Sequence, residues 1–497
     1  MEVIVTSDRT MISNHHGKEF LGFMTTSPPL FLPESLWMRL AAPKMRVNEK
    51  GEPWQAPYGL RKVEAALLNA GIDAAVVDPD HLLKHPEARV VAIGHHDFFA
   101  LGPPSSEWWV LTKREPLNAK SFRRFMESKA MDYFRRKGAK IIVGGPAAWQ
   151  WLYKPELIER WCVSTVIDGE AEKVIVDIVR RALDGEELPK FVQVGVDGVP
   201  SLGEIPLIRK PSVNGLIEIS RGCPRKCRFC SVTLRPLRHY TLEMVSREMD
   251  VNMRSGVRSV ILHSDDVLLY GSDSIYPNER ALMKLHELVK SKGAFPVGWS
   301  HFSLSAVKYA EDEYKLISRI SSMLGDYYKG VEVGIETGSP RLAERMMPAK
   351  ALPYDVRNWR EIVVDAFSIM HEAKIVPAAT LITGLPDERP EDTIASIELV
   401  EDLKEFRSLI VPMYFVPMGL LKGENWYKGE PTEEQLELMK ACLRHDLRWV
   451  EDVARWYMRD LNPLARYLLS LFISSIRVAV RGFLEPPRIE VRSQAPG

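Results

Sequence analysis

The stretch that decides the fold runs from Leu216 to Cys230 and reads LIEISRGCPRKCRFC. Its first five residues form an apolar run typical of a buried strand. Three of the chain's five cysteines follow, Cys223, Cys227 and Cys230, in the spacing CxxxCxxC. Three thiolates can hold three irons of a 4Fe-4S cubane and leave the fourth iron open to a small molecule. We therefore expect these cysteines to be the metal ligands and the catalytic centre.

A structural zinc site is the alternative for this loop. Zinc in such a site is closed by four ligands, and the nearest candidate for the fourth is His239. The other cysteines, Cys162 and Cys442, lie far apart in the sequence without companion cysteines. They cannot build a second cluster alone, and we expect buried, inert thiols.

Length and composition predict a soluble, multidomain protein. At 497 residues the chain exceeds the size at which one core keeps growing, and its 45% apolar and 27% charged residues are typical of globular proteins. The net charge is zero, which gives no overall attraction to nucleic acid. Few cysteines and an N-terminus, Met1 to Val5, that is typical of a strand predict a cytoplasmic location.

The segment from Gly215 to Gly423 alternates apolar runs with helical periodicity, which predicts six strand-helix units of an α/β barrel. Helices are expected between the strands, for example from Asn278 to Lys292 and from Trp359 to Lys374. Loops at the carboxyl ends of such strands bind ligands, and the cysteine loop follows the first strand. The expected strands are Leu216 to Ser220, Ser259 to His263, Val297 to Ser303, Val331 to Glu336, Ala378 to Thr383 and Leu409 to Phe415.

Residues 1 to 200 are predicted to form a separate, doubly wound α/β domain, because short apolar runs again alternate with helices. The barrel then covers residues 201 to 425, and a helical region covers 426 to 497. The paired Gly144 and Gly145 follow one expected strand; they allow the backbone to approach a flat ligand, or form a tight turn. His95 and His96 follow another and either approach a ligand or are ordinary polar residues at a strand end.

Phe229 before the last cysteine, together with the cysteine spacing, resembles the radical S-adenosylmethionine (SAM) superfamily. The resemblance implies a partial six-unit barrel, a 4Fe-4S cluster that binds SAM, and a 5′-deoxyadenosyl radical that takes hydrogen from unactivated carbon. PYGL at 57–60, IVGGP at 142–146 and IDGEAE at 167–172 resemble the cobalamin-binding domain of one subgroup, which implies cobalamin as a further cofactor. The subgroup's Asp-x-His-x-x-Gly pattern, whose histidine binds cobalt, is absent.

The resemblance also implies cofactor-binding residues besides Phe229, Gly144 and Gly145. His263-Ser264-Asp265-Asp266 stands where relatives carry Gly-Gly-Glu. Asp265 or Asp266 can accept the SAM ammonium, or the two can cap a helix. Glu336 in GIETGS matches an acid that faces the SAM ribose or methionine, and Gly384 allows the backbone to approach adenine. Ser303 hydrogen-bonds a ribose hydroxyl or only forms a turn.

Six basic residues crowd the cysteine loop. They can offset the charge of the cluster and guide an acidic electron donor, such as reduced flavodoxin or ferredoxin, or they form a solvated basic surface. They are Arg221, Arg225, Lys226, Arg228, Arg235 and Arg238.

Two helices are expected at the C-terminus, from Glu433 to Met458 and from Leu464 to Phe483. The uncharged part of the second, Tyr467 to Ile476, extends only about 15 Å, half of the roughly 30 Å hydrocarbon core. It therefore does not span a membrane. It can rest on a lipid surface, which suits a lipid substrate, or pack over the barrel or in a dimer contact.

The resemblance thus implies a radical SAM enzyme acting on an unactivated carbon of a small molecule or a lipid. The simplest reaction is cobalamin-dependent C-methylation, in which methylcobalamin supplies the methyl group. The alternative is cobalamin-free carbon-carbon coupling or cyclisation of a membrane lipid. A noncatalytic iron-sulfur or zinc module forms the third class, and it predicts no 5′-deoxyadenosine from SAM and dithionite.

Overall fold

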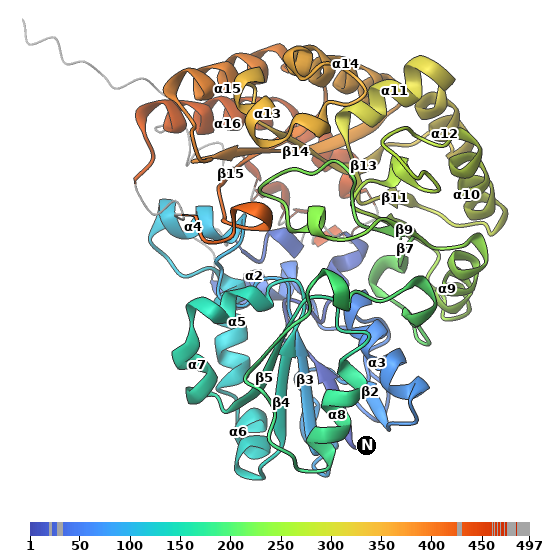
Figure 1. Cartoon of the computed structure of the whole chain (residues 1–497), viewed down its shortest axis with the longest axis vertical. Helices are drawn as coiled ribbons and strands as arrows, with labels where there is room; N and C mark the ends of the chain where they lie inside the picture. Colours follow the sequence, from blue (N-terminus) through green and yellow to red (C-terminus); the bar gives the residue numbers. More distant parts are fainter. Residues whose placement is uncertain are drawn as a thin grey trace, which may run out of the picture.

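The computed structural model describes the chain except for residues 19–21, 27–32, 425–429, 460, 462, 465, 468, 472, 475–483 and 485–497. An N-terminal sheet and a partial barrel dominate it, drawn below and above in Figure 1. All strand pairs of the N-terminal sheet are parallel, in the order β2-β1-β3-β4-β5-β6. The strands are β1 (Val3–Thr6), β2 (Ala74–Val76), β3 (Val90–Gly94), β4 (Lys140–Gly144), β5 (Val163–Asp168) and β6 (Phe191–Gln193).

Alternate residues of these strands point to two apolar layers. Val3 and Ala92 pack with helices α3 (Tyr58–Asn69) and α8 (Ile175–Leu183) on one face. Ile4 packs on the other face, where it joins a second cluster that includes residues of α5 (Leu117–Met126), α6 (Lys129–Arg136) and α7 (Pro155–Arg160). Helices on both faces of a parallel sheet define a doubly wound domain, so this prediction is confirmed.

The barrel consists of two sheets that meet at Ser300. Its N–H donates to the carbonyl of Leu262 and its carbonyl accepts from the N–H of Glu332, which joins the two sheets into one wall of six strand positions. The six predicted strand-helix units are therefore confirmed. The strand orders are β11-β10-β7 and β12-β13-β14-β15, from β7 (Leu216–Glu218), β10 (Val260–His263), β11 (Val297–Trp299), β12 (His301–Phe302), β13 (Lys329–Glu336), β14 (Ile375–Thr383) and β15 (Leu409–Tyr414).

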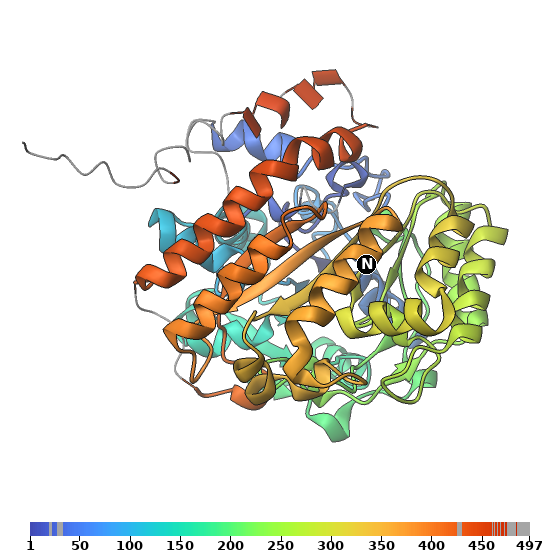
Figure 2. The same ribbon diagram turned by 90° about the horizontal axis from the view of Figure 1, so that it is seen from above.

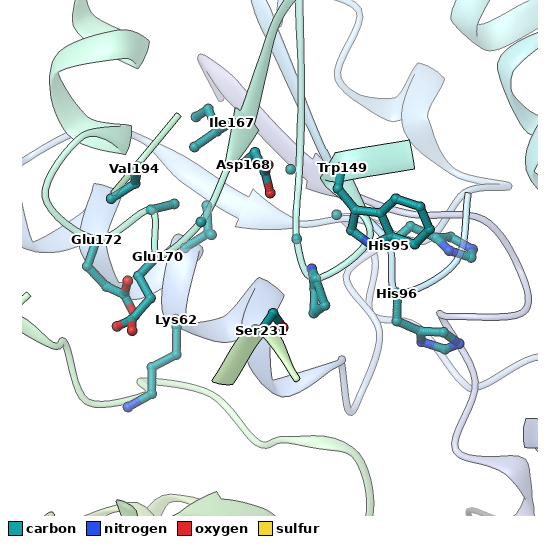
Figure 3. Close-up of a pocket in the computed structure, with 18 of the residues that line it drawn as sticks. Lys62, His95, His96, Trp149, Ile167, Asp168, Glu170, Glu172, Val194 and Ser231 are labelled. Carbon is teal, nitrogen blue, oxygen red and sulfur yellow. The ribbon is translucent and has the colours of Figure 1, made fainter. Parts of the chain in front are cut away.

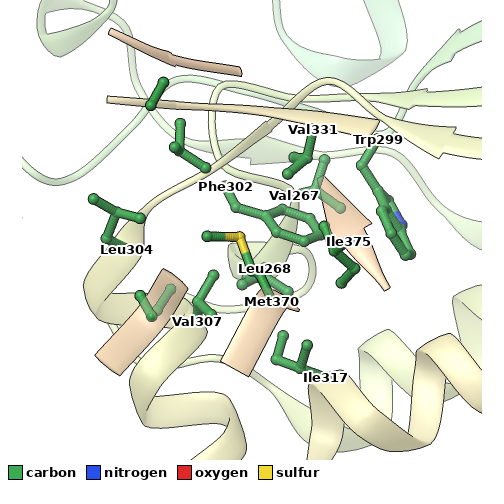
Figure 4. Packing of buried hydrophobic residues seen from close by; sticks show 14 of the residues in the cluster. Val267, Leu268, Trp299, Phe302, Leu304, Val307, Ile317, Val331, Met370 and Ile375 are labelled. Carbon is green, nitrogen blue, oxygen red and sulfur yellow. The ribbon is translucent and has the colours of Figure 1, made fainter. Parts of the chain in front are cut away.

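Helices cover the outside of the barrel and supply its apolar core. Phe302, Val307, Ile317 and Met370 interlock there (Figure 4), and full burial of such a side chain contributes roughly 1.5–3 kcal/mol. The two helices predicted in detail are confirmed as α10 and α14. The helices are α9 (Leu242–Arg254), α10 (Glu279–Ser291), α11 (Leu304–Tyr314), α12 (Leu316–Leu324), α13 (Pro340–Met346), α14 (Trp359–Glu372) and α15 (Pro390–Asp402).

The last strand, β15, has an open edge because six strands do not close a barrel. Two carboxylates and a proline occupy this edge. The N–H of Ile410 donates to Asp446 Oδ1 at 2.7 Å, Pro412 has no N–H, and the N–H of Tyr414 donates to Glu107 Oε1 at 2.6 Å. Asp446 lies on α16 (Glu433–Tyr457), and Glu107 lies on α4 (Ser105–Thr112) of the N-terminal domain.

The C-terminal part begins with the predicted helix, observed as α16, whose first turn is capped by Thr432. Of the second predicted helix, residues 465, 468, 472 and 475–483 lie outside the described part. Leu469 packs against Trp37 and Leu40 of α2 (Glu34–Ala41), and Figure 2 shows the red C-terminal segment beside the blue α2. This part of the segment therefore packs within the chain, but on α2 and not over the barrel as the packing alternative expected. No helix among the described residues has the length and apolarity needed to cross a bilayer.

Candidate functional site

A short antiparallel ribbon encloses the cysteine loop. β8 (Ser220–Arg221) pairs with β9 (Arg238–His239), and the loop between them carries Cys223, Cys227 and Cys230. Gly222 starts the loop at φ +87°, where an added Cβ would overlap the carbonyl of Pro236. The first turn therefore requires glycine.

The three thiols are largely enclosed by the protein. Burial raises the pKa of Cys223 to about 12 and that of Cys227 to about 11, and it also raises the pKa of Cys230. Thiols ligate iron as thiolates, so loading of the site must release protons. The donor set of three cysteines fits a 4Fe-4S cluster with one open iron.

The zinc alternative depends on His239, whose Nε2 lies 2.6 Å from the carbonyl oxygen of Ser272. In the part of the chain that the structure describes, no three His, Cys, Asp or Glu side chains are arranged as ligands of one metal ion. A cubane does not need such convergence, because each thiolate binds a different iron.

The two aspartates after β10 have different partners. Asp265 Oδ2 accepts the N–H of Gly222 at 2.8 Å, which ties the second barrel strand to the cysteine loop. Asp266 accepts the N–H and hydroxyl of Ser303 and the Nε–H of Arg225. Asp266 precedes the short helix Val267–Leu269 but makes no side-chain cap bond, so the capping alternative is wrong for this residue. Ser303 and Asp266 bond each other, and Asp265 is more open to a ligand.

Glu336 ends β13 just after a shift in strand register, and its φ of +65° is a strained value for this residue type. Its Oε1 accepts from Lys350 Nζ at 2.6 Å and its Oε2 accepts from Thr380 Oγ1 at 3.1 Å. Gly334 makes room for this pair, since an added Cβ would collide with the Glu336 carboxylate. Although burial opposes it, Glu336 raises the pKa of Lys350, and Cys227 does the same.

Gly384 and Phe229 each contact other residues of the barrel. Gly384 follows β14 at φ +78°, and its N–H donates to Glu388 Oε2 at 2.7 Å. Phe229 packs with Leu342, Leu385 and other apolar residues, so it anchors the cysteine loop to the barrel. The structure therefore brings the three cysteines, Asp265, Asp266, Ser303 and Glu336 to one end of the barrel.

Three features of this region were not predicted from the sequence. Arg225, in the middle of the cysteine loop, is buried and donates to Ser305 Oγ and to the carbonyls of Lys350 and Leu352. The second feature is another buried cation, Lys350. The third feature is the turn at Gly419, where an added Cβ would lie 2.5 Å from the carbonyl of Cys230. These contacts join segments far apart in sequence. Of the three residues, only Gly419 has a residue type that indicates a turn locally.

A cavity of about 770 Å³ lies between the carboxyl ends of the N-terminal strands and the cysteine loop. Figure 3 shows Trp149, Asp168 and Glu170 on its N-terminal side and Ser231 of the cysteine loop opposite. The cavity continues between the sheet and helices α3 and α8, where its walls include Val5, Ala66, Ala92, Ile142 and Ile175. Protein interiors are close-packed, so a slot inside this layer indicates a binding site.

Gly144 and Gly145 line this cavity, at a distance in sequence from the cysteines. Gly145 has φ +103°, and an added Cβ would lie 2.8 Å from the carbonyl of His95, so a turn and a close backbone contact require it. His95 is buried, with Nε2 3.0 Å from Asp8 Oδ1 and Nδ1 accepting the N–H of Asp97. It is therefore a structural residue. His96 lines the cavity, and its side chain is exposed.

Two sequence predictions on charge and cysteines need correction. Cys442 is buried as expected, but Cys162 is exposed because it lies in the turn between α7 and β5. Of the six basic residues, Arg221, Arg225 and Arg238 are held in ion pairs inside the protein. Lys226 and Arg228 are exposed. The basic surface at the loop is thus smaller than predicted.

Comparison with known proteins agrees with this geometry. Residues 217–400 match the sequence model described as the Radical SAM superfamily. A probable threonylcarbamoyladenosine tRNA methylthiotransferase from Archaeoglobus fulgidus is 27% identical over 343 residues, 67% of this chain and 74% of the relative. The ribosomal protein uS12 methylthiotransferase RimO from Thermotoga maritima is 27% identical over 311 residues, 58% of this chain and 67% of the relative.

Among solved structures, the radical SAM methyltransferase TsrM from Kitasatospora setae has the same fold. The TM-score is 0.55 at 15% identity, and the match covers 85% of this chain and 75% of TsrM. Another structure of TsrM contains cobalamin and a 4Fe-4S cluster. A radical SAM domain implies a 4Fe-4S cluster, SAM and a reductant. Residues 217–400, with the three cysteines at the mouth of the barrel, belong to the radical SAM superfamily.

Proposed function

We propose that the protein is a cobalamin-dependent radical SAM enzyme that methylates an unactivated carbon. The observation that carries this proposal is the 770 Å³ cavity, which faces the N-terminal sheet on one side and the cysteine loop on the other. A substrate between the two sites would be within reach of both cofactors. Two separate cofactor sites that face each other are needed if one generates a substrate radical and the other supplies the methyl group.

The residues around the cavity suit a corrinoid. The volume lies within the range of small-molecule sites, roughly 300–1,000 Å³. The slot between the sheet and α3 is lined by apolar residues and by Gly94 and Gly144, which suits a flat aromatic group. At the rim, burial raises the pKa of Asp168, and the cavity gives its carboxylate access to the amide groups of a corrin.

The chain's own residues would divide the work at the cluster. Cys223, Cys227 and Cys230 would hold the cluster, while Asp265 would orient the ammonium of SAM by a charge-assisted bond. Glu336, fixed by Lys350 and Thr380, would orient the ribose or methionine part. When bound, the cluster and SAM supply a 5′-deoxyadenosyl radical and the corrinoid supplies a methyl group.

Sulfur insertion, the reaction in the names of the two methylthiotransferase relatives, is not proposed for this chain. Methylthiotransferases of this superfamily carry further cysteines that hold a second cluster. Here the remaining cysteines are the exposed Cys162 and the buried Cys442, which lie in different parts of the fold. Two isolated thiols do not hold a cluster.

Radical carbon-carbon bond formation on a lipid is the second candidate. It is supported by Leu464, Tyr467 and Leu471, whose exposed fractions are 67%, 62% and 48%. These residues recur at helical spacing and form an apolar stripe beside the packed Leu469, as expected for a helix that touches a lipid surface. This candidate does not need the corrinoid.

Anaerobic reconstitution with iron, sulfide and hydroxocobalamin separates the candidates. We expect corrin absorption that stays with the protein through gel filtration. With SAM carrying a CD₃ group, a reductant and a cell extract, we expect 5′-deoxyadenosine and a CD₃-labelled product by mass spectrometry. Cys227→Ala should keep the corrinoid and lose 5′-deoxyadenosine. Protein that makes 5′-deoxyadenosine but retains no corrinoid would contradict methyl transfer and favour the lipid reaction.

A further inference from the structure

Glu170, in the N-terminal domain, contacts both ends of the cysteine loop. Its Oε2 accepts from Arg221 Nη1 at 2.7 Å, and its Oε1 accepts from Arg238 Nη2 at 2.7 Å. Arg221 and Arg238 are cross-strand partners in the ribbon β8-β9, and the loop between them contains all three cluster cysteines. We call these contacts the Glu170 clamp.

The Glu170 clamp offsets the repulsion between the two positive charges of the ribbon. Two arginines placed directly opposite each other repel, and here both are largely enclosed, with exposed fractions of 12% for Arg221 and 11% for Arg238. Glu170 is only 6% exposed and is the one carboxylate in the described structure that is paired with both. Although burial opposes it, Arg238 and Arg221 lower the pKa of Glu170, so the carboxylate stays charged.

Glu172 and Glu218 provide a contrast. Each lies 2.6 Å from Arg221, but neither is paired with Arg238 among the described contacts. Glu172 is about as enclosed as Glu170, with an exposed fraction of 10%. It therefore belongs to the same charged cluster and does not join the two strands.

The other side of Glu170 faces the cavity. Asp168 ends β5, Gly169 and Glu170 form the turn after it, and all three line the cavity; Figure 3 labels Asp168 and Glu170. Gly169 has φ +123°, and an added Cβ would lie 2.7 Å from the carbonyl of Val194, so the turn is closely packed. A ligand that presses on this turn must act on Glu170, because little free space can absorb the movement.

We propose that the Glu170 clamp couples the two cofactor sites: it holds the base of the cysteine loop closed and transmits occupancy of the cavity to the cluster. Glu170 is thus a positioning residue that acts through Arg221 and Arg238. The inference rests on the proposed function for the identity of the cavity ligand. Coupling between binding sites is reciprocal, so the cluster must also change the affinity for the corrinoid.

The test compares hydroxocobalamin affinity of full-length protein with and without the reconstituted cluster, by absorbance titration. For the wild type we expect tighter binding with the cluster, by about 5-fold or more, the lower end of typical coupling. In Glu170→Gln the ratio of the affinities with and without the cluster should fall towards one. Glu172→Gln, the matched control, should keep the wild-type ratio. The EPR spectrum of the reduced cluster should change on corrinoid binding in the wild type and in Glu172→Gln, and not in Glu170→Gln.

A wild-type ratio of one, or Glu170→Gln that keeps the wild-type ratio, would overturn the inference. Failure of the wild type to retain any corrinoid would instead overturn the proposed function. The clamp can then be judged without corrinoid, since Glu170→Gln and not Glu172→Gln should alter the EPR spectrum and iron content. If Glu170→Gln does not fold, Arg238→Lys provides the second variant, because lysine keeps the charge and loses the two-pronged bond.

Discussion

Lys350 Nζ lies 2.6 Å from Glu336 Oε1, and the two side chains form a buried ion pair beside the cluster cysteines. Neither residue is a ligand of the cluster. The pair lies at the end of β13, where the register shift and the positive φ of Glu336 turn its carboxylate towards Lys350. Such strain persists only where the surroundings fix it, which indicates a functional position.

The first prediction concerns this pair. Lys350→Met leaves the Glu336 carboxylate buried without its cation, and removing one partner of a buried pair typically costs about 3–5 kcal/mol. We expect urea unfolding to detect this loss and 5′-deoxyadenosine formation to fall strongly. The double variant Lys350→Met/Glu336→Gln should regain most of the stability and none of the activity. If it regained activity, the pair would be only structural.

Regular periodicity explains why most of the fold could be predicted. The strands of the barrel and of the N-terminal sheet are buried apolar runs between helical segments, and both signals are local. The cysteine loop was equally visible because its spacing is a local pattern. Element bounds agree closely, as for α16, predicted from Glu433 to Met458 and observed as Glu433–Tyr457.

The contacts that organise the site were not predictable in the same way. Glu170 meets Arg221 and Arg238, and Glu107 meets Tyr414, across large sequence separations. Nothing in the local pattern distinguishes such charges from solvated ones. Burial decides their roles, and burial depends on how the two domains pack. For the same reason, no local pattern indicated that Cys162 is exposed.

The second prediction uses Glu107, whose buried carboxyl accepts the N–H of Tyr414 at the barrel edge. Burial raises the pKa of Glu107 from 4.5 to about 7. The folded state then binds this proton more tightly than the unfolded state. Protonation of Glu107 therefore contributes fully to the free energy of unfolding below pH 4.5, and this contribution is lost as the pH rises to 7. From the shift, the loss amounts to about 3 kcal/mol above pH 7.

Glu107→Gln removes this titration and keeps an acceptor for Tyr414. Between pH 5 and pH 8 the wild type should therefore lose up to about 3 kcal/mol of unfolding free energy relative to Glu107→Gln, which has no carboxyl to titrate there. Urea unfolding at several pH values measures it. Glu401→Gln, at an exposed position, serves as the control. A difference that does not change with pH would contradict the role of Glu107.

The third prediction concerns thiol reactivity. Burial raises the pKa values of Cys223 and Cys227 to about 12 and 11, so in cluster-free protein these thiols stay protonated at pH 8. Since the thiolate is the nucleophile, iodoacetamide should label the exposed Cys162 first, and labelling of the other two should speed up as the pH rises. Mass spectrometry of peptides follows each site. Fast labelling of Cys223 at pH 8 would contradict this account.

The fourth prediction compares two glycines after β15 that share a positive φ, +60° at Gly419 and +99° at Gly423. A Cβ at Gly419 would lie 2.5 Å from the carbonyl of Cys230, whereas a Cβ at Gly423 meets no atom of the described residues within 4 Å. Both alanine variants therefore pay the backbone strain, about 1 kcal/mol or more. Only Gly419→Ala must also push the turn away from the cysteine loop.

We expect Gly419→Ala to retain less iron and sulfide after reconstitution and gel filtration, and Gly423→Ala to retain as much as the wild type. Thermal unfolding of the cluster-free proteins measures the cost of each substitution itself, and Gly419→Ala should lose more stability than Gly423→Ala because only its Cβ clashes with the cysteine loop. The N–H of Leu420 donates to the carbonyl of Arg228 at 2.8 Å, so movement of this turn also releases the loop from the barrel. Equal iron retention in the two variants would mean that this turn plays no part in holding the cluster.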